Sequence, residues 1–330
     1  MNSTRPQPRW GVARGLVACL LAVLAAATLL AFLGRGHWRF DVVAHARPQL
    51  AAAALTLALL ALPLRAWRLA ALAAVVTLVN AAVIAPLWVG GRDPGAATPR
   101  ITLMHFNVHT SNQRYADVCR VIGASRADLV FVLECNEAWA RALETRVQGY
   151  SVAPDARRPR QDNFGMLLLV REGLPATIVL ESARLMDVTN GLAQVPAIEV
   201  RLRVDDRALS VLGLHTLPPV SSDYAMVRDA QLSAAAQWAA DQQHAGRSVV
   251  VIGDFNTTPW APSFGLLTEP AGLVNSQFGY GLATSWPSGS WFVRIPIDHA
   301  VHSADVWTLA RELGEASGSD HRPLRLELGW

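Results

Sequence analysis

Three long runs of uncharged, mostly apolar residues fill most of the first 90 residues, at about 15–34, 48–64 and 69–90. A helix that crosses a bilayer needs roughly 20 such residues. The first run lacks a small-residue cleavage site and is followed by two more apolar runs, so it does not fit a signal peptide. We therefore predict that residues 1–90 form a membrane anchor with three transmembrane helices. Burial in a protein core is the competing interpretation, and it has most weight for the short second run.

Arginine placement bears on how such an anchor is oriented, because cytoplasmic loops of membrane proteins are enriched in Lys and Arg. The segments that flank the three runs carry five Arg on each side of the membrane, so the rule decides little about the topology. The flank that precedes the first run is purely positive, with Arg5, Arg9 and Arg14, and it favours an N-terminus inside the cell. In a bacterium, everything after the third run would then lie on the periplasmic side of the inner membrane. The opposite topology stays open.

The charge of the chain divides sharply between its two parts. Residues 1–98 hold nine Arg and two acidic residues, a net charge of +7, whereas residues 99–330 hold 20 Arg and 24 acidic residues, a net charge of −4. The second part therefore has no bulk attraction for polyanions. Two of the three cysteines, Cys119 and Cys135, lie in it; they form a disulfide in an oxidising compartment or stay as buried free thiols.

A Gly- and Pro-rich stretch at 91–99 predicts a linker, and residues 100–330 form one folded domain. Strand-length apolar runs recur through that domain, mixed with helical patterns such as the one from Met226 to Ala245. Continuous apolar strands are typical of sheets covered on both faces. The pattern predicts an α/β fold in which two packed sheets carry helices on the outside.

Polar side chains follow these apolar runs at the point where each run stops. The runs ITLMHF, LVFVL, LSVLGL, VVVIG and IPI are followed by Asn107, Glu134, His215, Asp254 with Asn256, and Asp298 with His299, while Asp320 and His321 directly precede PLRLEL. If the strands share a core, their ends meet at one edge. Carboxylates, imidazoles and carboxamides without an obvious nucleophile suit a hard cation and an activated water.

The order FNVHTSN, VLECN, GLHTLPP, GDFNTTP, PIDH and SDHRP resembles the endonuclease/exonuclease/phosphatase superfamily, which includes DNase I, abasic-site endonucleases, neutral sphingomyelinases and inositol polyphosphate phosphatases. The resemblance covers about residues 100–328. The N-terminal runs resemble a membrane-attached bacterial branch of that superfamily. The resemblance implies a four-layered α/β sandwich of the DNase I type, with its site at one edge, and Mg²⁺ or Mn²⁺ as the cofactor.

The resemblance also implies a role for each matching residue. Metal ligands would be Glu134, Asn107 and Asp320; catalytic residues would be His215, Asp254, Asn256, Asp298 and His321; substrate-binding residues would include Asn107, His215 and Asn256. Asp298 would be the carboxylate partner of His321, and either Asp254 or His321 would be the base. Some family members have an acidic residue where this chain has His109, so the chain offers fewer carboxylates to a metal. One or two metal ions remain open.

Other residues leave two interpretations each. Arg158, in a basic loop with Arg157 and Arg160, contacts a phosphate or a headgroup, or is simply solvated. Trp286 and Trp291 line a cleft or touch a bilayer, or they pack in the core. His105 and His299 are assigned to packing rather than to chemistry.

We therefore expect a divalent-metal-dependent phosphoesterase, tethered to a membrane, that acts on a lipid headgroup, a nucleic acid or a small phosphoester. A nuclease that acts on DNA or RNA is one alternative. A non-catalytic, membrane-tethered binding module with the same fold is another. The sequence carries no signal for an obligate protein partner.

Overall fold

The computed structural model describes residues 10–90 and 99–330, so that residues 91–98 of the predicted linker lie outside the described residues. The chain divides into two compact units. One unit holds the N-terminal helices up to Pro86 together with Trp260–Pro262, and the other holds Leu87–Pro259 and Ser263–Trp330.

The N-terminal unit is helical. Its elements are α1 (Trp10–Leu30), η1 (Ala31–Leu33), α2 (Trp38–His45), α3 (Arg47–Ala61), α4 (Trp67–Ile84) and η2 (Ala85–Leu87, which crosses into the second unit). Leu21, Ala54 and Val76 lie in the small apolar core that joins α1, α3 and α4. A buried polar bridge crosses the same helices, because the Asn80 amide donates to Thr28 Oγ1 at 2.9 Å.

Among the described residues, two helical segments are long and apolar enough to cross a membrane, Gly11–Leu33 and Trp67–Leu87. The predicted middle span at 48–64 differs: α3 ends at Ala61, and α3 follows α2 at an angle of 62°. The bent pair brings the number of spans to three if it crosses as one. Pro48, in the first turn of α3, cannot continue a preceding helix without loss of a hydrogen bond, which accounts for a break at this point.

The second unit is built on two mixed sheets of six strands each. The first sheet has the order β11-β12-β1-β2-β4-β3 and the second has the order β5-β6-β7-β8-β10-β9. The strands of the first sheet are β1 (Pro99–Asn107), β2 (Leu129–Leu133), β3 (Tyr150–Arg158), β4 (Met166–Arg171), β11 (Trp307–Leu313) and β12 (Leu324–Gly329). Those of the second are β5 (Ile178–Met186), β6 (Ala197–Val204), β7 (Arg207–His215), β8 (Ser248–Asp254), β9 (Val274–Asn275) and β10 (Asp298–His302).

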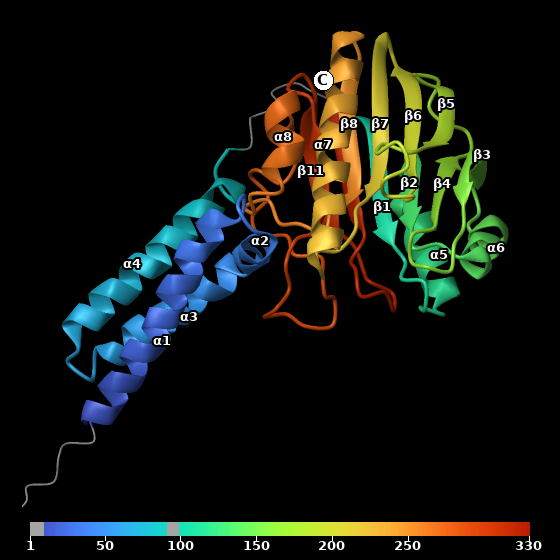
Figure 1. Ribbon diagram of the computed structural model, residues 1–330. Coiled ribbons are helices and arrows are strands. Elements are labelled where there is room, and N and C mark those ends of the chain that lie inside the picture. The colour runs from blue at the N-terminus through green and yellow to red at the C-terminus, as the bar shows by residue number, and fades with distance from the viewer. Residues whose placement is uncertain (1–9, 91–98) are drawn as a thin grey trace, which may run out of the picture. The chain divides into compact units, whose positions relative to one another are not determined.

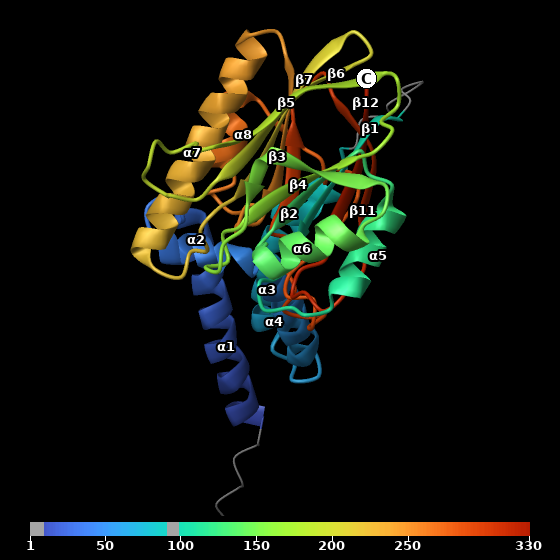
Figure 2. The same cartoon turned by 90° about the vertical axis from the view of Figure 1, so that its right-hand side faces the viewer.

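Helices cover the outer face of each sheet, as Figure 2 shows. Helices α5 (Tyr115–Ser125) and α6 (Glu137–Arg146) pack on the first sheet, and α7 (Ser222–His244) and α8 (Gly265–Ala271) pack on the second. Local capping sets two helix starts: the side chains of Asn136 and Ser221 accept hydrogen bonds from the first turns of α6 and α7. The expected long helix from Met226 to Ala245 is therefore α7, which begins four residues earlier, at Ser222.

Strand alternation decides which side chains meet between the two sheets. On β1, Ile101 and Leu103 face the layer between the sheets, whereas Met104 and Phe106 face the helices. Because side chains on a strand point alternately to opposite faces, His105 and Asn107 follow Leu103 into the inner layer. By the same alternation, His215 on β7, Asp254 on β8 and Asp298 on β10 lie on the same face of their strands as the apolar residues of the inner layer. Figure 1 shows β7 and β8 side by side next to α7.

Gly213 on β7 lies opposite a buried aromatic side chain of the other sheet. A Cβ at this position would lie 2.3 Å from Cδ1 of Phe131, which is fully buried on β2 of the other sheet. Because Gly213 has no side chain, the Phe131 ring fits against β7.

We expect Gly213→Ala to lower the apparent midpoint of thermal unfolding, because overpacking of a close-packed core costs about 1–3 kcal/mol. The matched control is Gly123→Ala in α5, where no atom lies within 4 Å of the added Cβ. That control should leave the midpoint unchanged or raise it, since Ala favours a helix over Gly by about 1 kcal/mol. Equal midpoints for Gly213→Ala and the wild type would contradict this account of the sheet interface.

Candidate active site at the sheet edge

Three neighbouring strands of the second sheet place three polar residues side by side. His215 on β7 pairs with Asp254 on β8 in parallel register, and Asp254 pairs with Asp298 on β10 in antiparallel register. Here the structure corrects one expectation. The run IPI is not the strand that ends at Asp298; the strand begins at Asp298, because β10 runs antiparallel to β8 and its start lies beside the end of β8.

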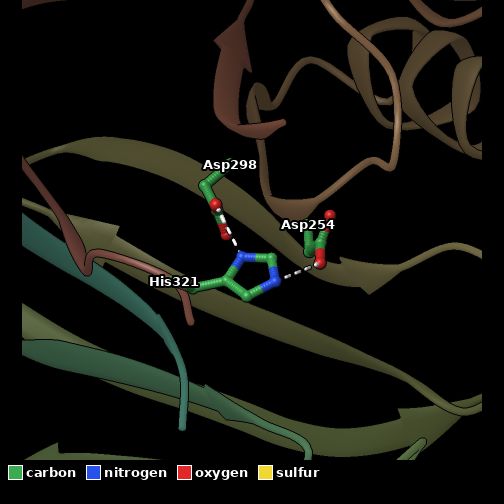
Figure 3. Close-up of side chains that lie close together, drawn as sticks. All are labelled: Asp254, Asp298 and His321. Atoms are coloured by element: carbon green, nitrogen blue, oxygen red, sulfur yellow. Dashed lines mark hydrogen bonds and ion pairs between the residues drawn. The ribbon is translucent and has the colours of Figure 1, made fainter. Parts of the chain in front are cut away.

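Asp298 is the centre of a buried hydrogen-bonded chain. Its carboxylate is fully buried, with Oδ1 at 2.6 Å from Nε2 of His105 and Oδ2 at 2.8 Å from Nδ1 of His321. On the far side of the His321 ring, Nε2 lies 3.6 Å from Oδ2 of Asp254. Figure 3 shows His321 held between the two carboxylates. Such an arrangement fixes the orientation of the imidazole and favours its charged form.

Asp254 receives hydrogen bonds from two sides. Its Oδ1 accepts from the backbone N–H of Asn256 at 3.0 Å, and its Oδ2 lies 3.3 Å from Nδ2 of Asn107 on the other sheet. Asn107 therefore links the two sheets at their shared edge. The Asn256 side chain donates to the carbonyl of Thr216 at 2.8 Å, so one of its amide hydrogens serves the loop rather than the cluster.

Glu134 lies next to this group, directly after β2. Its Oε1 accepts from Nδ2 of Asn107 at 2.9 Å, and its Oε2 accepts from the backbone N–H of Thr110 at 3.3 Å. Glu134, His109 and Asn256 all have φ in the left-handed region, at 54°, 62° and 46°. Residues other than Gly rarely adopt this conformation, and its concentration at one place is typical of functional sites.

His215 is buried among groups that keep it neutral. Its ring lies 5.1 Å from the ring of Phe164, and its Nε2 is 3.8 Å from Oδ2 of Asp254. Burial, together with repulsion by the charged His321, lowers the pKa of His215 to about 3. His215 is thus an uncharged imidazole at neutral pH.

The acidic groups of the site have strongly perturbed pKa values. Burial raises the pKa of Asp254, and the His321 charge only partly offsets that effect. Burial also raises the pKa of Glu134 despite the hydrogen bond from Asn107. For Asp298 burial acts in the same direction, yet the His321 charge and the bonds from both histidines hold its pKa far below its usual range.

The histidine in the middle shifts the other way. Burial alone would lower the pKa of His321, but the charges of Asp298 and Asp254 and the hydrogen bond from Asp298 raise it well above the usual value. His321 therefore keeps its proton where a free imidazole, with a pKa of about 6.5, has lost it.

The remaining predicted residues lie farther from this centre. Asp320 is partly exposed; its Oδ2 accepts from Nε1 of Trp286 at 3.0 Å, and its Oδ1 is 3.6 Å from Nδ1 of His109. Arg158 is exposed and lines a separate cavity of about 360 Å³ with Asp187 and Gln194, and the structure gives it no contact with the carboxylate cluster. His299 is buried, with Nε2 at 3.0 Å from the Thr257 carbonyl, which fits the packing role expected for it.

Both cysteines of this unit are free thiols in the structure. Cys119 and Cys135 are buried, and burial raises the pKa of each thiol.

The sequence leaves the role of Trp286 open and favours packing for His105, and the structure places both in contact with residues of the site. Trp286 binds Asp320, and its ring centroid lies 6.4 Å from that of His321. His105 binds Asp298 instead of merely packing. A signal for His105 exists in the sequence, because it stands two residues before Asn107 and must share its face of the strand.

Residues 104–321 match the family model described as Endonuclease/Exonuclease/phosphatase family. The chain belongs to this family. Its members hydrolyse phosphoester bonds, and the two six-stranded sheets with outer helices are the DNase I-like fold. None of the curated proteins matches the chain.

Solved structures share the fold at low sequence identity. A D. rerio TDP2 humanized by 14 mutations has a TM-score of 0.56 at 16% identity, and the match covers 69% of this chain and 98% of the TDP2 chain. An endonuclease/exonuclease/phosphatase family protein from Bacteroides thetaiotaomicron has a TM-score of 0.52 at 16% identity, and the match covers 71% of this chain and 97% of the other. A D. rerio TDP2 complexed with single strand DNA product has a TM-score of 0.53 at 15% identity, and the match covers 69% of this chain and 98% of the other.

The site also offers places for a metal ion. Asp254, Asp298 and His321 present ligand atoms within 4.8 Å of one another, which is close enough for one ion. Glu134 and the side-chain oxygen of Asn107 add oxygen donors beside them. Oxygen-rich sets of this kind suit Mg²⁺ or Mn²⁺.

We expect Asp298→Asn to lower the pKa of His321 toward the value of a free histidine, because it removes the nearer of the two negative charges. Linkage gives the sign for stability: a raised pKa contributes stability that is complete below about pH 6.5 and is lost as pH rises through the folded value. A titration of ¹⁵N-histidine-labelled full-length chain in detergent with EDTA measures the shift. An unchanged His321 pKa would show that Asp298 does not set its charge.

Proposed function

We propose that the chain is a divalent-metal-dependent phosphoesterase held at a membrane by its N-terminal helices. The observation that carries the proposal is the buried alignment Asp254–His321–Asp298 beside Glu134 at the edge of the sheets. The family of the chain supports the reaction class. We propose residues 1–90 as the anchor, 91–99 as the linker and 100–330 as the catalytic domain, on the periplasmic side of a bacterial inner membrane.

Hydrolysis of a phosphoester demands mainly positioning and neutralisation of charge on the phosphoryl oxygens. His321 suits the second task, because its raised pKa keeps it a cationic donor at neutral pH. Asp254 suits the task of proton acceptor, because burial lifts its pKa to about 8, close to neutral pH. We therefore assign the base to Asp254 and charge stabilisation to His321, while neutral His215 and Asn256 bind phosphoryl oxygens.

The donor set around Glu134 fits a hard cation. Burial raises the pKa of Glu134, so a positive charge beside this carboxylate would relieve an unfavourable desolvation. We assign the ion to Glu134 and Asn107, with Asp320 at the rim of the same site. The alternative cluster of Asp254, Asp298 and His321 fits less well, because both ring nitrogens of His321 already face carboxylates. When bound, the ion would supply Lewis-acid stabilisation of the phosphoryl charge.

The full-length chain in detergent should hydrolyse bis(p-nitrophenyl) phosphate with Mg²⁺ or Mn²⁺ and lose that activity in EDTA. Asp254→Ala and His321→Ala should each lower kcat by at least about 10²-fold, the usual loss for a proton-transfer or charge-stabilising group. Glu134→Gln should raise the Mn²⁺ concentration needed for half-maximal rate. Initial rates over a metal titration measure all three.

Asp128→Asn is the matched control, because Asp128 is a buried aspartate that binds the Thr102 N–H and Arg171 outside the site. The folded fraction of the Asp128→Asn variant should keep the kcat of the wild type. If no metal supports turnover of any phosphoester, the chain is the non-catalytic binding module instead. Unchanged rates in Asp254→Ala and His321→Ala would show that the site is assigned wrongly.

An exposed apolar loop beside the site favours a phospholipid as substrate. In the loop Pro287–Val293, Trp291 is 85% and Phe292 is 63% exposed. The loop is fastened to the site, since the Ser288 N–H donates to the Asp320 carbonyl at 2.7 Å. Trp is enriched at membrane–water interfaces. The twelve residue-to-residue steps from Leu87 to Pro99 reach at most about 43 Å when extended, so a spanning anchor would keep the domain near the bilayer.

The double variant Trp291→Ser with Phe292→Ser should lower hydrolysis of phosphatidylglycerol vesicles about tenfold or more, because interfacial binding scales with buried apolar area. Turnover of bis(p-nitrophenyl) phosphate should not change. Val179→Ser, which changes a solvent-exposed apolar residue on β5, should change neither rate.

The nuclease alternative is an outcome of the same assays. Its support is the DNA product bound to a TDP2 of the same fold, and the net charge of −4 on residues 99–330 weighs against tight duplex binding. Faster turnover of single-stranded DNA than of phospholipid or small phosphoesters would decide for a nuclease.

A further inference from the structure

His105 lies at the end of the hydrogen-bonded chain, on the side away from Asp254. Its side chain is fully buried on β1, and its Nε2 is 2.6 Å from Oδ1 of Asp298. This contact is shorter than the 2.8 Å contact between Asp298 and His321. A histidine that only filled space in this layer, next to Leu103 and Leu324, would carry the cost of burying a polar ring with no return.

The tautomer of a neutral His105 ring follows from the surroundings of its other nitrogen. Nδ1 is buried and has no hydrogen-bond partner among the described residues. A proton at Nδ1 would therefore be buried without an acceptor, which is unfavourable. The single proton of a neutral ring belongs on Nε2, where it is donated to the Asp298 carboxylate.

The two histidines together fix the plane of the Asp298 carboxylate. Each oxygen has one imidazole donor, and the donors come from strands or loops of the first sheet, whereas Asp298 begins a strand of the second. Without His105, Oδ1 would be a buried carboxylate oxygen with no donor among the described residues. The carboxylate could then rotate away from Nδ1 of His321 or take up a proton.

We infer that His105 is a positioning residue of the active site, which donates to Asp298 and so holds the carboxylate that orients His321. The catalytic consequence rests on the proposed hydrolysis, whereas the effect on His321 does not. His105 touches neither substrate nor metal in this scheme. It acts on the reaction only through Asp298.

The test uses the full-length chain in detergent, with bis(p-nitrophenyl) phosphate and Mn²⁺. His105→Ala should lower kcat by about 10- to 100-fold with KM little changed, the usual loss when a supporting hydrogen bond behind a site residue is removed. His105→Gln should recover most of the loss, because its side-chain amide can donate to the same carboxylate oxygen. His105→Ala should add little further loss to Asp298→Asn, since both break one chain of contacts.

His302→Gln is the control for loss of a buried histidine. His302 lies on β10 and binds the Ser303 carbonyl and Thr308 Oγ1, away from the carboxylate cluster. It should lower thermal stability without the selective loss of kcat. Equal kcat losses in His105→Ala and His302→Gln at matched folded fractions, or fully additive losses with Asp298→Asn, would overturn the inference.

A second measurement needs no turnover. In the ¹⁵N-histidine spectrum of the chain, which has nine His, His105→Ala should shift the His321 Nδ1 resonance, and His105→Gln should leave it near its wild-type position. An unmoved His321 resonance in His105→Ala overturns the positioning role. If the wild type has no phosphoesterase activity but the resonance moves as expected, the proposed function fails and the contact chain stands.

Discussion

A buried carboxylate with one imidazole on each oxygen is the interaction on which this site depends. Asp298 is fully buried, and its negative charge is held by the charge and hydrogen bond of His321 and by the hydrogen bond of His105. The same charge keeps His321 protonated between Asp298 and Asp254. Removal of any member leaves a buried group without a partner. The charges in the cluster therefore depend on its geometry.

The two sheets supply this cluster jointly. The first sheet contributes Asn107 from β1, and the second contributes Asp254 and Asp298 from adjacent strands. Apolar inner residues such as Leu103 and Ile252 fill the layer behind them and exclude water. Because charges interact more strongly in a poorly hydrated layer, the core that stabilises the fold also shifts the pKa values of the site.

The balance of charge at this edge is negative before any ligand binds. Glu134, Asp254 and Asp298 are close together, and burial is the largest cause of the raised pKa of Glu134 and of Asp254. His321 is the cation among them, and the charges of Asp298 and Asp254 hold its pKa above the usual value. A divalent cation would bring positive charge to this edge and a phosphoester would bring negative charge. The polar side chains of the edge can orient both.

Local patterns in the sequence were enough to indicate the architecture and most of the cluster. Apolar runs of strand length predicted β1, β2, β7 and β8, and the polar residue after each run lies at the common edge. The run IPI is the exception: the pattern predicts a strand that ends at Asp298, whereas β10 begins there. A run of letters contains neither the direction of a strand nor the identity of its neighbour, and for the same reason the sequence does not show that buried His105 contacts Asp298.

The amino-acid sequence by itself determined which residues are polar at strand ends, that the first 90 residues are apolar enough for membrane spans, and that the family motifs occur in order. Only the tertiary structure decided that Asp298 lies opposite Asp254 and that His105 reaches it from 193 residues away. The physical reason is that register and sheet packing are non-local: a strand selects its partners through hydrogen bonds and buried surface contributed by distant segments. Those contacts decide which buried charges share a partner.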